Sequence, residues 1–197
     1  MIEQDTIQKL SANVSTTCEV IAGLNAMASS VSTASQLIHD ALVTGGKLLC
    51  CGNGGSAADS AHFAAEIAGR YVIERPGFPA INLTGDNSLV TALINDYPAD
   101  EVFARQVTAL GAAGDVLAVF STSGNSANVL KAVEAAKEKG IRTIAFLGRD
   151  GGKCKGMADA EMIVSADATA RIQEAHLLLY HTICEVLDPL LAAKANS

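Results

Sequence analysis

The chain has few basic residues for its length, and this excludes one broad class of function. Its 197 residues include 14 Lys and Arg against 21 Asp and Glu, which gives a net charge of −7. Surfaces that bind nucleic acid need clustered Lys and Arg side chains to neutralise phosphates. We therefore expect no direct nucleic-acid partner.

Long hydrophobic runs are also missing, although 49% of the residues are apolar and only 18% are charged. No run reaches the roughly 18 apolar residues that a membrane span needs. The acidic start, residues 1–5, lacks the basic and apolar regions of a secretory signal. The composition predicts a globular protein of one domain, located in the cytoplasm and not in a membrane.

A CxxC pair is absent too, and the number of cysteines is odd. Cys50 and Cys51 are neighbours on an expected strand, so their side chains should point to opposite faces of the sheet. We expect Cys18, Cys50, Cys51, Cys154 and Cys184 to be reduced and to lie in or near the core, which agrees with a cytoplasmic location.

What the chain does contain is a regular alternation of short apolar strands and helices. Strands are expected at 47–51, 80–83, 116–121, 143–147 and 161–164. Helices are expected at 56–69, 88–94, 102–110 and 126–140, and a long closing helix at about 168–191. This alternation is typical of a parallel sheet that is covered by helices on both faces.

Five such strands predict a flavodoxin-like, doubly wound α/β fold with strand order 2-1-3-4-5 and a ligand crevice between strands 1 and 3. Residues 4–45 precede this unit and form two expected helices, the second with an apolar stripe at Ala34, Leu37, Ile38 and Leu42. We expect the helical pair to lie outside the α/β unit and to need a partner surface. The single domain, 1–197, is thus divided into helices for oligomerisation (1–45) and an α/β core (46–197).

The first strand ends in a glycine-rich loop, Gly52-Asn53-Gly54-Gly55-Ser56. Backbone amides at the start of the following helix suit an oxygen-rich, often phosphorylated ligand. The stretch also fits the GxGxxA pattern of dinucleotide-binding proteins, which expects an acidic residue about twenty positions later. Asp86 comes 34 residues after Gly52, so nicotinamide binding is the weaker interpretation.

The third strand ends in a second loop, 121–126, which has four hydroxyl side chains and one amide. Ser126 is expected to be the N-cap of the next helix. The loop has no Lys and no GxxxxGK[ST] pattern, so it does not bind nucleoside triphosphates in the P-loop manner. It suits the single phosphate of a sugar phosphate, and the alternative is an ordinary capped turn.

Candidate catalytic or metal-binding side chains occur at helical spacing. His62 and Glu66 are four residues apart and share one helix face. On the closing helix, Gln173 and His181 are two turns and about 80° apart, so they can border one groove. These four residues could bind a metal or transfer protons. Spacing alone equally allows satisfied core histidines, which is how we interpret His176.

With these motifs the chain resembles the sugar isomerase (SIS) domain family, and within it the bacterial phosphoheptose isomerases. The resemblance covers nearly the whole chain and includes CGNGGSAADSAHFAAEIAGRY, RPGFPAI, GDVLAVFSTSGNSANV, GRDGGKCKGMAD and RIQEAH. Asn95-Asp96, which spacing alone would assign to a simple turn before Tyr97-Pro98, also match.

The resemblance implies an SIS fold and specific ligands. It implies one zinc ion per subunit, bound by His62, Glu66, Gln173 and His181. The sugar phosphate would be bound by Asn53, Gly54, Gly55, Glu66, Asn95, Asp96, Ser121, Thr122, Ser123, Ser126 and Gln173.

It further implies an aldose–ketose isomerase that converts sedoheptulose 7-phosphate to D-glycero-D-manno-heptose 7-phosphate for lipopolysaccharide precursor synthesis. Glu66 would be the catalytic base and His181 the catalytic acid. The assembly implied is a homotetramer whose sites are completed between subunits.

A sister branch, the DnaA initiator-associating proteins, offers an alternative function. These proteins share the fold and most motifs but act as non-catalytic scaffolds that regulate replication initiation. Cys50-Cys51 and the stretches 86–87 and 100–102 resemble that branch. The position of Glu66 is typically not acidic there, so the intact set of four residues favours the enzyme. DnaA is an expected partner only under the alternative.

Overall fold

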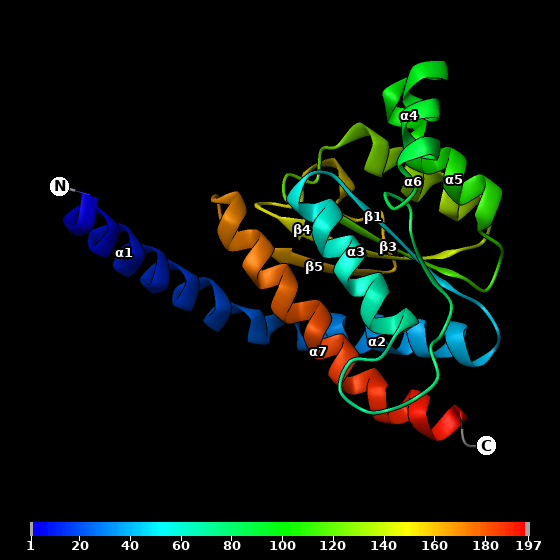
Figure 1. The fold of residues 1–197 in the computed structure, drawn as a ribbon, viewed down its shortest axis with the longest axis horizontal. Coiled ribbons are helices and arrows are strands. Elements are labelled where there is room, and N and C mark those ends of the chain that lie inside the picture. The colour runs from blue at the N-terminus through cyan, green and yellow to red at the C-terminus, as the bar shows by residue number, and fades with distance from the viewer. Residues whose placement is uncertain (1, 196–197) are drawn as a thin grey trace.

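The computed structural model describes residues 2–195 and has a parallel five-stranded sheet at its centre (Figure 1). The strands are β1 (Leu48–Gly52), β2 (Ala80–Asn82), β3 (Val116–Ser121), β4 (Arg142–Gly148) and β5 (Ala160–Val164). Their order, β2-β1-β3-β4-β5, confirms the predicted doubly wound topology. In register, Leu48 of β1 is opposite Ala80 of β2 and Val116 of β3. The loops after β1 and β3 therefore emerge at the same edge of the sheet.

Helices cover both faces of the sheet. They are α1 (Ile2–Gly23), α2 (Ala28–Val43), α3 (Gly55–Ala68), α4 (Asn87–Asp96), α5 (Val102–Leu110), α6 (Ala127–Glu138) and α7 (Thr169–Ala195). Buried side chains of α2, α3 and α7 form one core with the sheet, and those of α5 and α6 form a second core on the other face. Cys50 belongs to the first core and Cys51 to the second, as the alternation of strand side chains requires.

The two N-terminal helices differ in how they pack. α2 contributes Val31, Ala34, Ile38 and Leu42 to the core, because its apolar stripe lies against the sheet and α7. The expectation that both helices lie outside the α/β unit is therefore wrong for α2. α1 has no buried residue and extends away from the body of the molecule (Figure 1).

Because α1 extends away from the body of the molecule, one cysteine is exposed. All five cysteines are free, and four of them are buried, as expected. Cys18 is exposed, because it lies on α1, where no other element covers its side of the helix. The expectation of a core or near-core position is wrong for Cys18 alone.

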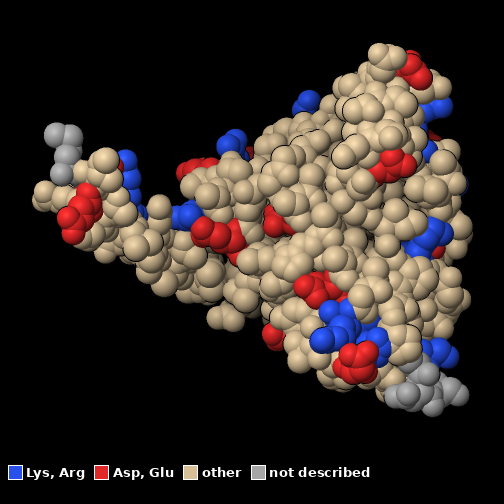
Figure 2. All heavy atoms as spheres, viewed as in Figure 1, with Lys and Arg blue, Asp and Glu red and all other residues tan. Residues whose placement is uncertain are grey.

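Charged side chains are mixed on the surface. Figure 2 shows acidic and basic groups interspersed on the face drawn, with apolar and neutral residues between them. Between residues 2 and 195, no helix is both long enough and apolar enough to cross a membrane.

One histidine is part of the core, as predicted. His176 of α7 is completely buried, and its Nε2 is hydrogen-bonded to the carbonyl oxygen of Leu147 at 3.0 Å. Its ring lies edge-on to Phe120 and Phe146, with centroids 6.1 and 5.9 Å away. Burial lowers the pKa of His176 to about 4, against the weaker opposing effect of the Leu147 hydrogen bond.

We predict that His176 makes stability depend on pH. The unfolded chain takes up a proton near pH 6.5 but the folded chain only near pH 4, so the free energy of unfolding falls as pH drops through this window. The loss amounts to on the order of 3 kcal/mol. Urea unfolding of the wild type and His176→Phe at several pH values checks this. The difference between the two proteins should shrink by that amount from pH 6.5 to 4, and a constant difference would contradict the prediction.

Candidate functional site

α3 and α7 lie side by side and bring three titratable side chains together (Figure 1). His62 and Glu66 come from α3 and His181 from α7, and one candidate ligand atom of each lies within 4.8 Å of the others. His62 Nε2 and Glu66 Oε1 are 2.8 Å apart. The side chains of His62 and Glu66 are 43% and 20% exposed, so the cluster can be reached from solvent. Three of the four residues predicted to share a site are thus in one place.

His181, the member of the cluster on α7, has one ring nitrogen that makes no hydrogen bond in the described chain. Its Nε2 is buried and has no hydrogen-bond partner among residues 2–195. Burial, and after it the neighbouring His62, lower the pKa of His181 below its ordinary value, although Glu66 and Glu185 oppose the shift. The ring is therefore neutral near pH 7, which is the state in which imidazole binds metals.

Gln173 lies nearer the loop end of the site. A Cβ atom added to Gly55 would be 2.2 Å from Gln173 Nε2, so any side chain at this position would displace the amide. Gly55 begins α3 seven residues before His62, which corresponds to about 10 Å along the helix. In this position the Gln173 amide lies against the start of α3, next to the glycine-rich loop.

The two polar loops meet at the carboxyl edge of the sheet. Asn53 of the first loop and Asn128 of α6 exchange two amide hydrogen bonds of 2.9 Å. In the second loop, Ser121 Oγ accepts from the amide of Gly124 at 3.1 Å and lies 3.3 Å from Ser126 Oγ. Ser126 occupies the N-cap position of α6, but its side chain makes no capping hydrogen bond. The predicted position of the N-cap is therefore right, but the predicted capping hydrogen bond is absent because the hydroxyl faces Ser121 instead.

The middle of the second loop leaves its hydroxyls open to a ligand. Ser123 Oγ accepts only from the amide of Asn125, at 3.2 Å, and Thr122 makes no side-chain hydrogen bond within the described chain. The carbonyl oxygen of Thr122 lies so close to Gly148 that an added Cβ would be 2.5 Å from it. The loop is thus fixed by its backbone while its side chains keep free donors and acceptors.

Asp86 has a structural role. Its side chain accepts a hydrogen bond of 3.0 Å from the amide of Leu89 and so caps α4. This use of the Asp86 carboxylate counts against a role in binding a ribose, and so against the dinucleotide interpretation.

Asn95 and Asp96 are not brought together with the cluster. They end α4, their side chains are exposed, and Asn95 Nδ2 donates to Asp96 Oδ1 at 2.8 Å. Figure 1 shows α4 at the far end of the molecule from the lower half of α7. Within one chain, this pair lies apart from His62, Glu66 and His181.

Two residues of the site were not predicted. Asp59 lies one turn before His62, and its buried Oδ2 has no partner in the described part of the chain. Burial raises the pKa of Asp59 to about 6, which the nearby His62 opposes. The i, i+3 spacing to His62 could have indicated Asp59 as a member of the site.

Tyr180 is the second of these residues, because its hydroxyl is 2.9 Å from His62 Nδ1. In the sequence it stands in an apolar stretch and could not be distinguished from a core residue.

A buried ion pair joins the loop after α3 to α7. Arg75 Nε donates to Asp188 Oδ1 at 2.8 Å, and the two side chains are 1% and 3% exposed. Asp188 Oδ2 also accepts from the amides of Val72 and Ile73. Burial alone would raise the pKa of Asp188, but these hydrogen bonds outweigh it and hold the pKa below its ordinary value. The loop carries Tyr71, whose ring centroid lies 5.4 Å from that of His181.

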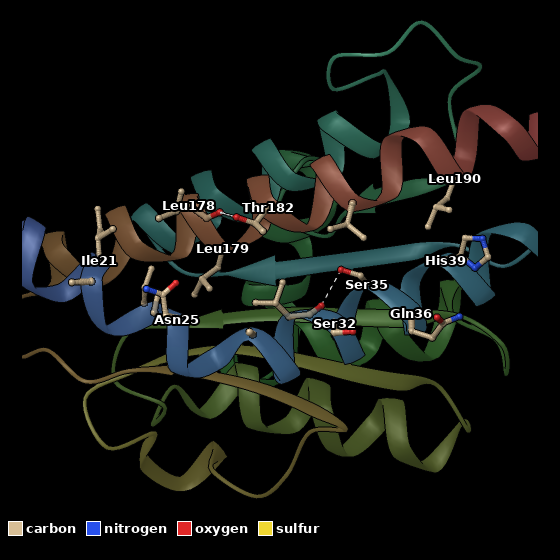
Figure 3. A pocket seen from close by; sticks show the side chains of 15 residues that line it. Ile21, Asn25, Ser32, Ser35, Gln36, His39, Leu178, Leu179, Thr182 and Leu190 are labelled. Carbon is tan, nitrogen blue, oxygen red and sulfur yellow. Dashed lines mark hydrogen bonds between the residues drawn. The ribbon is translucent and has the colours of Figure 1, made fainter.

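An apolar pocket of about 600 Å³ lies on a different face of α7 (Figure 3). It is bounded by the end of α1, by α2, and by Leu178, Thr182 and Val186, which follow one another at four-residue spacing. His62, Glu66 and His181 do not line it. The pocket is therefore separate from the polar site.

Comparisons with known proteins agree on one family. A family model for the SIS domain matches residues 12–148. The phosphoheptose isomerase of Geobacter sp. (strain M21) is 47% identical over 191 residues, which cover 96% of this chain and all of the relative. That of Helicobacter pylori (strain Shi470) is 53% identical over 158 residues, 80% of this chain and 82% of the relative. The solved phosphoheptose isomerase from Neisseria gonorrhoeae superposes with a TM-score of 0.88 at 44% identity, covering 93% and 99% of the two chains. These matches favour the isomerase branch over the initiator-associating branch.

We predict that the buried pair of Arg75 and Asp188 stabilises the fold around the site. Arg75→Met leaves Asp188 buried without its cation, so the free energy of unfolding should fall by about 3–5 kcal/mol. Arg70→Met is the matched control, because Arg70 pairs with Glu74 in the same loop at the surface, and should cost less than about 1 kcal/mol. Urea unfolding measures both. Equal losses in the two variants would contradict the prediction.

Proposed function

The chain belongs to the SIS-domain family and, within it, to the phosphoheptose isomerases, and we propose that it interconverts sedoheptulose 7-phosphate and D-glycero-D-manno-heptose 7-phosphate. The observation that carries the proposal is the cluster of one carboxylate and two imidazoles on α3 and α7. A scaffold has no use for such a set, whereas isomerisation needs both a base and an acid. We assign the enzyme to the cytoplasm and to the supply of heptose for lipopolysaccharide.

The proposed reaction moves hydrogen between two neighbouring carbons. Glu66 takes a proton from C1 of the ketose while the carbonyl oxygen on C2 takes one from water, which gives an enediol. His181 then delivers a proton to C2 as the C1 hydroxyl returns one to water, and the aldose results. The proton held by Glu66 then passes to His181, which restores both residues. The neutral imidazole of His181 suits this role because one of its nitrogens carries a hydrogen. Each of the two proton transfers contributes roughly 10²–10⁴ in rate.

A zinc ion fits the donor set. His62 Nε2, a Glu66 carboxylate oxygen and the unpartnered Nε2 of His181 would hold it, and these are the ligand types that zinc prefers. Gln173 would complete the set once its side chain turns from Gly55 toward His181. When bound, zinc would act as a Lewis acid that polarises the sugar oxygens.

The phosphate would bind at the loop end of the site. The hydroxyls of Ser121, Thr122, Ser123 and Ser126 and the backbone of Asn53, Gly54 and Gly55 supply its donors at the starts of α3 and α6. From Gly55 to Glu66 is eleven residues of helix, or about 16 Å. A sugar phosphate that contacts both the loops and the proton-transfer residues has to span much of this length, which favours an extended heptose over a short sugar.

We predict that turnover depends on Glu66 and on zinc. Zinc-loaded wild type should convert sedoheptulose 7-phosphate to the aldose, and a chelator should abolish this. Glu66→Gln should lose at least about 10²-fold in kcat because the amide cannot accept the proton. Aldose formation is followed by a coupled assay, with zinc content and melting temperature measured in parallel.

The matched control is Glu74→Gln, at an exposed position in the neighbouring loop, which should keep full activity. An active Glu66→Gln protein would remove Glu66 as the base. A folded, zinc-loaded wild type without turnover would overturn the isomerase and favour the DnaA-associated scaffold.

We further propose a homotetramer. Ile7, Leu10 and Val14 form a stripe on α1 and are 63%, 62% and 53% exposed, although apolar side chains at helical spacing normally pack against a partner. The apolar pocket between α1, α2 and α7 adds a second uncovered surface. The distance of Asn95 and Asp96 from the cluster within one chain supports sites that are completed by a neighbouring copy.

We predict that the α1 stripe holds the assembly together. Leu10→Glu places a charge in the stripe and should reduce the mass measured by light scattering to that of a smaller species. Gln8→Glu adds the same charge to an exposed polar position off the stripe and should leave the mass unchanged. A wild-type monomer with full activity would rule out the tetramer.

A further inference from the structure

The ring of Tyr180 packs in the core, whereas its hydroxyl contacts a residue of the candidate site. The residue is completely buried on α7, yet its hydroxyl oxygen lies 2.9 Å from His62 Nδ1. Buried tyrosines normally find a hydrogen-bond partner for this group. Here the partner is an imidazole of the candidate metal cluster.

The two nitrogens of His62 have separate tasks. Nε2 faces Glu66 Oε1 at 2.8 Å, inside the cluster, and Nδ1 faces Tyr180. A histidine that binds a metal through one nitrogen is oriented by the group that holds the other, because that contact fixes both the ring and the tautomer. The geometry therefore gives Nε2 to the metal and Nδ1 to the tyrosine.

The core keeps the hydroxyl at this position. The ring of Tyr180 has its centroid 5.5 Å from Phe63 and 6.1 Å from Phe120, and both of these residues are fully buried. The ring of His62 meets that of Tyr180 edge-on at 5.4 Å. Since closely packed aromatic rings have little room to turn, the hydroxyl cannot leave His62 without disturbing the core.

A hydroxyl can form a hydrogen bond with His62 Nδ1 whether or not a metal is bound. Without metal, His62 Nε2 can donate its hydrogen to Glu66 while Nδ1 accepts from the tyrosine. With metal on Nε2, the hydrogen moves to Nδ1 and is donated to the tyrosine oxygen. A hydroxyl both donates and accepts, so the contact survives the exchange.

We propose that Tyr180 is a positioning residue for the metal site: its hydroxyl orients His62 and selects Nε2 as the atom that binds a divalent cation. The proposal rests on the metal site of the proposed function. It assigns Tyr180 no contact with the sugar.

The test is the zinc affinity of Tyr180→Phe, measured by competition with a chromophoric chelator. Phenylalanine keeps the ring packing and removes only the hydroxyl, so the melting temperature of the metal-free protein should change little. Zinc affinity should fall about 10- to 100-fold, which is the usual effect of losing the group that holds a ligand histidine. Tyr97→Phe is the matched control, because Tyr97 follows α4, is 41% exposed and has its ring against Arg105. Its affinity should match the wild type.

The outcomes separate this inference from the proposed function. A wild type that binds zinc together with a Tyr180→Phe protein of equal affinity would overturn the role of Tyr180 and leave the metal site standing. A wild type that binds no zinc would remove the metal site, and the inference with it. Nitrogen NMR of zinc-loaded wild type needs no variant. It should show the hydrogen of His62 on Nδ1, and an unprotonated Nδ1 would also overturn the inference.

Discussion

The site depends on one constraint, which is that α3 and α7 stay in fixed register. At one end, Gly55 allows the Gln173 amide to approach α3, and a larger residue would push it away. At the other end, the buried pair of Arg75 and Asp188 joins the loop after α3 to α7. The buried pair and the packing of α3 against α7 hold the two helices in register, so the side chains of α7 keep their positions relative to α3. The position of His181 opposite His62 and Glu66 follows from this.

The fold could be predicted from the sequence because its signals are local. From the apolar runs, β3 and α5 were predicted with the bounds that the structure shows, Val116–Ser121 and Val102–Leu110. The alternation of strands and helices predicted the strand order of the sheet. The place of α2 could not be predicted in the same way. An apolar stripe indicates that a helix needs a partner, but only the tertiary structure shows that the partner is this chain's own sheet and α7.

The site residues could be predicted where helical spacing or the family resemblance indicated them. They could not be predicted where the role of a side chain depends on a buried contact with a distant part of the chain. His62 and Glu66 share a helix face whether the helix is buried or exposed, so their four-residue spacing was enough to predict that they lie together. Tyr180 stands in an apolar stretch of α7, and nothing in its neighbours shows that its hydroxyl reaches His62. Ser126 shows the reverse case: its position predicted a cap, but a neighbouring hydroxyl directs its side chain elsewhere. Contacts between residues that are far apart in the chain account for both differences.

The exposed first helix has a consequence for how unfolding is measured. Residues 2–16 are all exposed, so a single chain gains almost no apolar surface when this segment melts. Heat-capacity changes and denaturant m-values scale with newly exposed surface. In a dissociated chain, calorimetry would therefore register a cooperative unit that begins near Thr17, where the Oγ donates to Glu174 of α7. An association that covers α1 would add its surface to the transition, so the apparent size of the unfolding unit would rise with protein concentration.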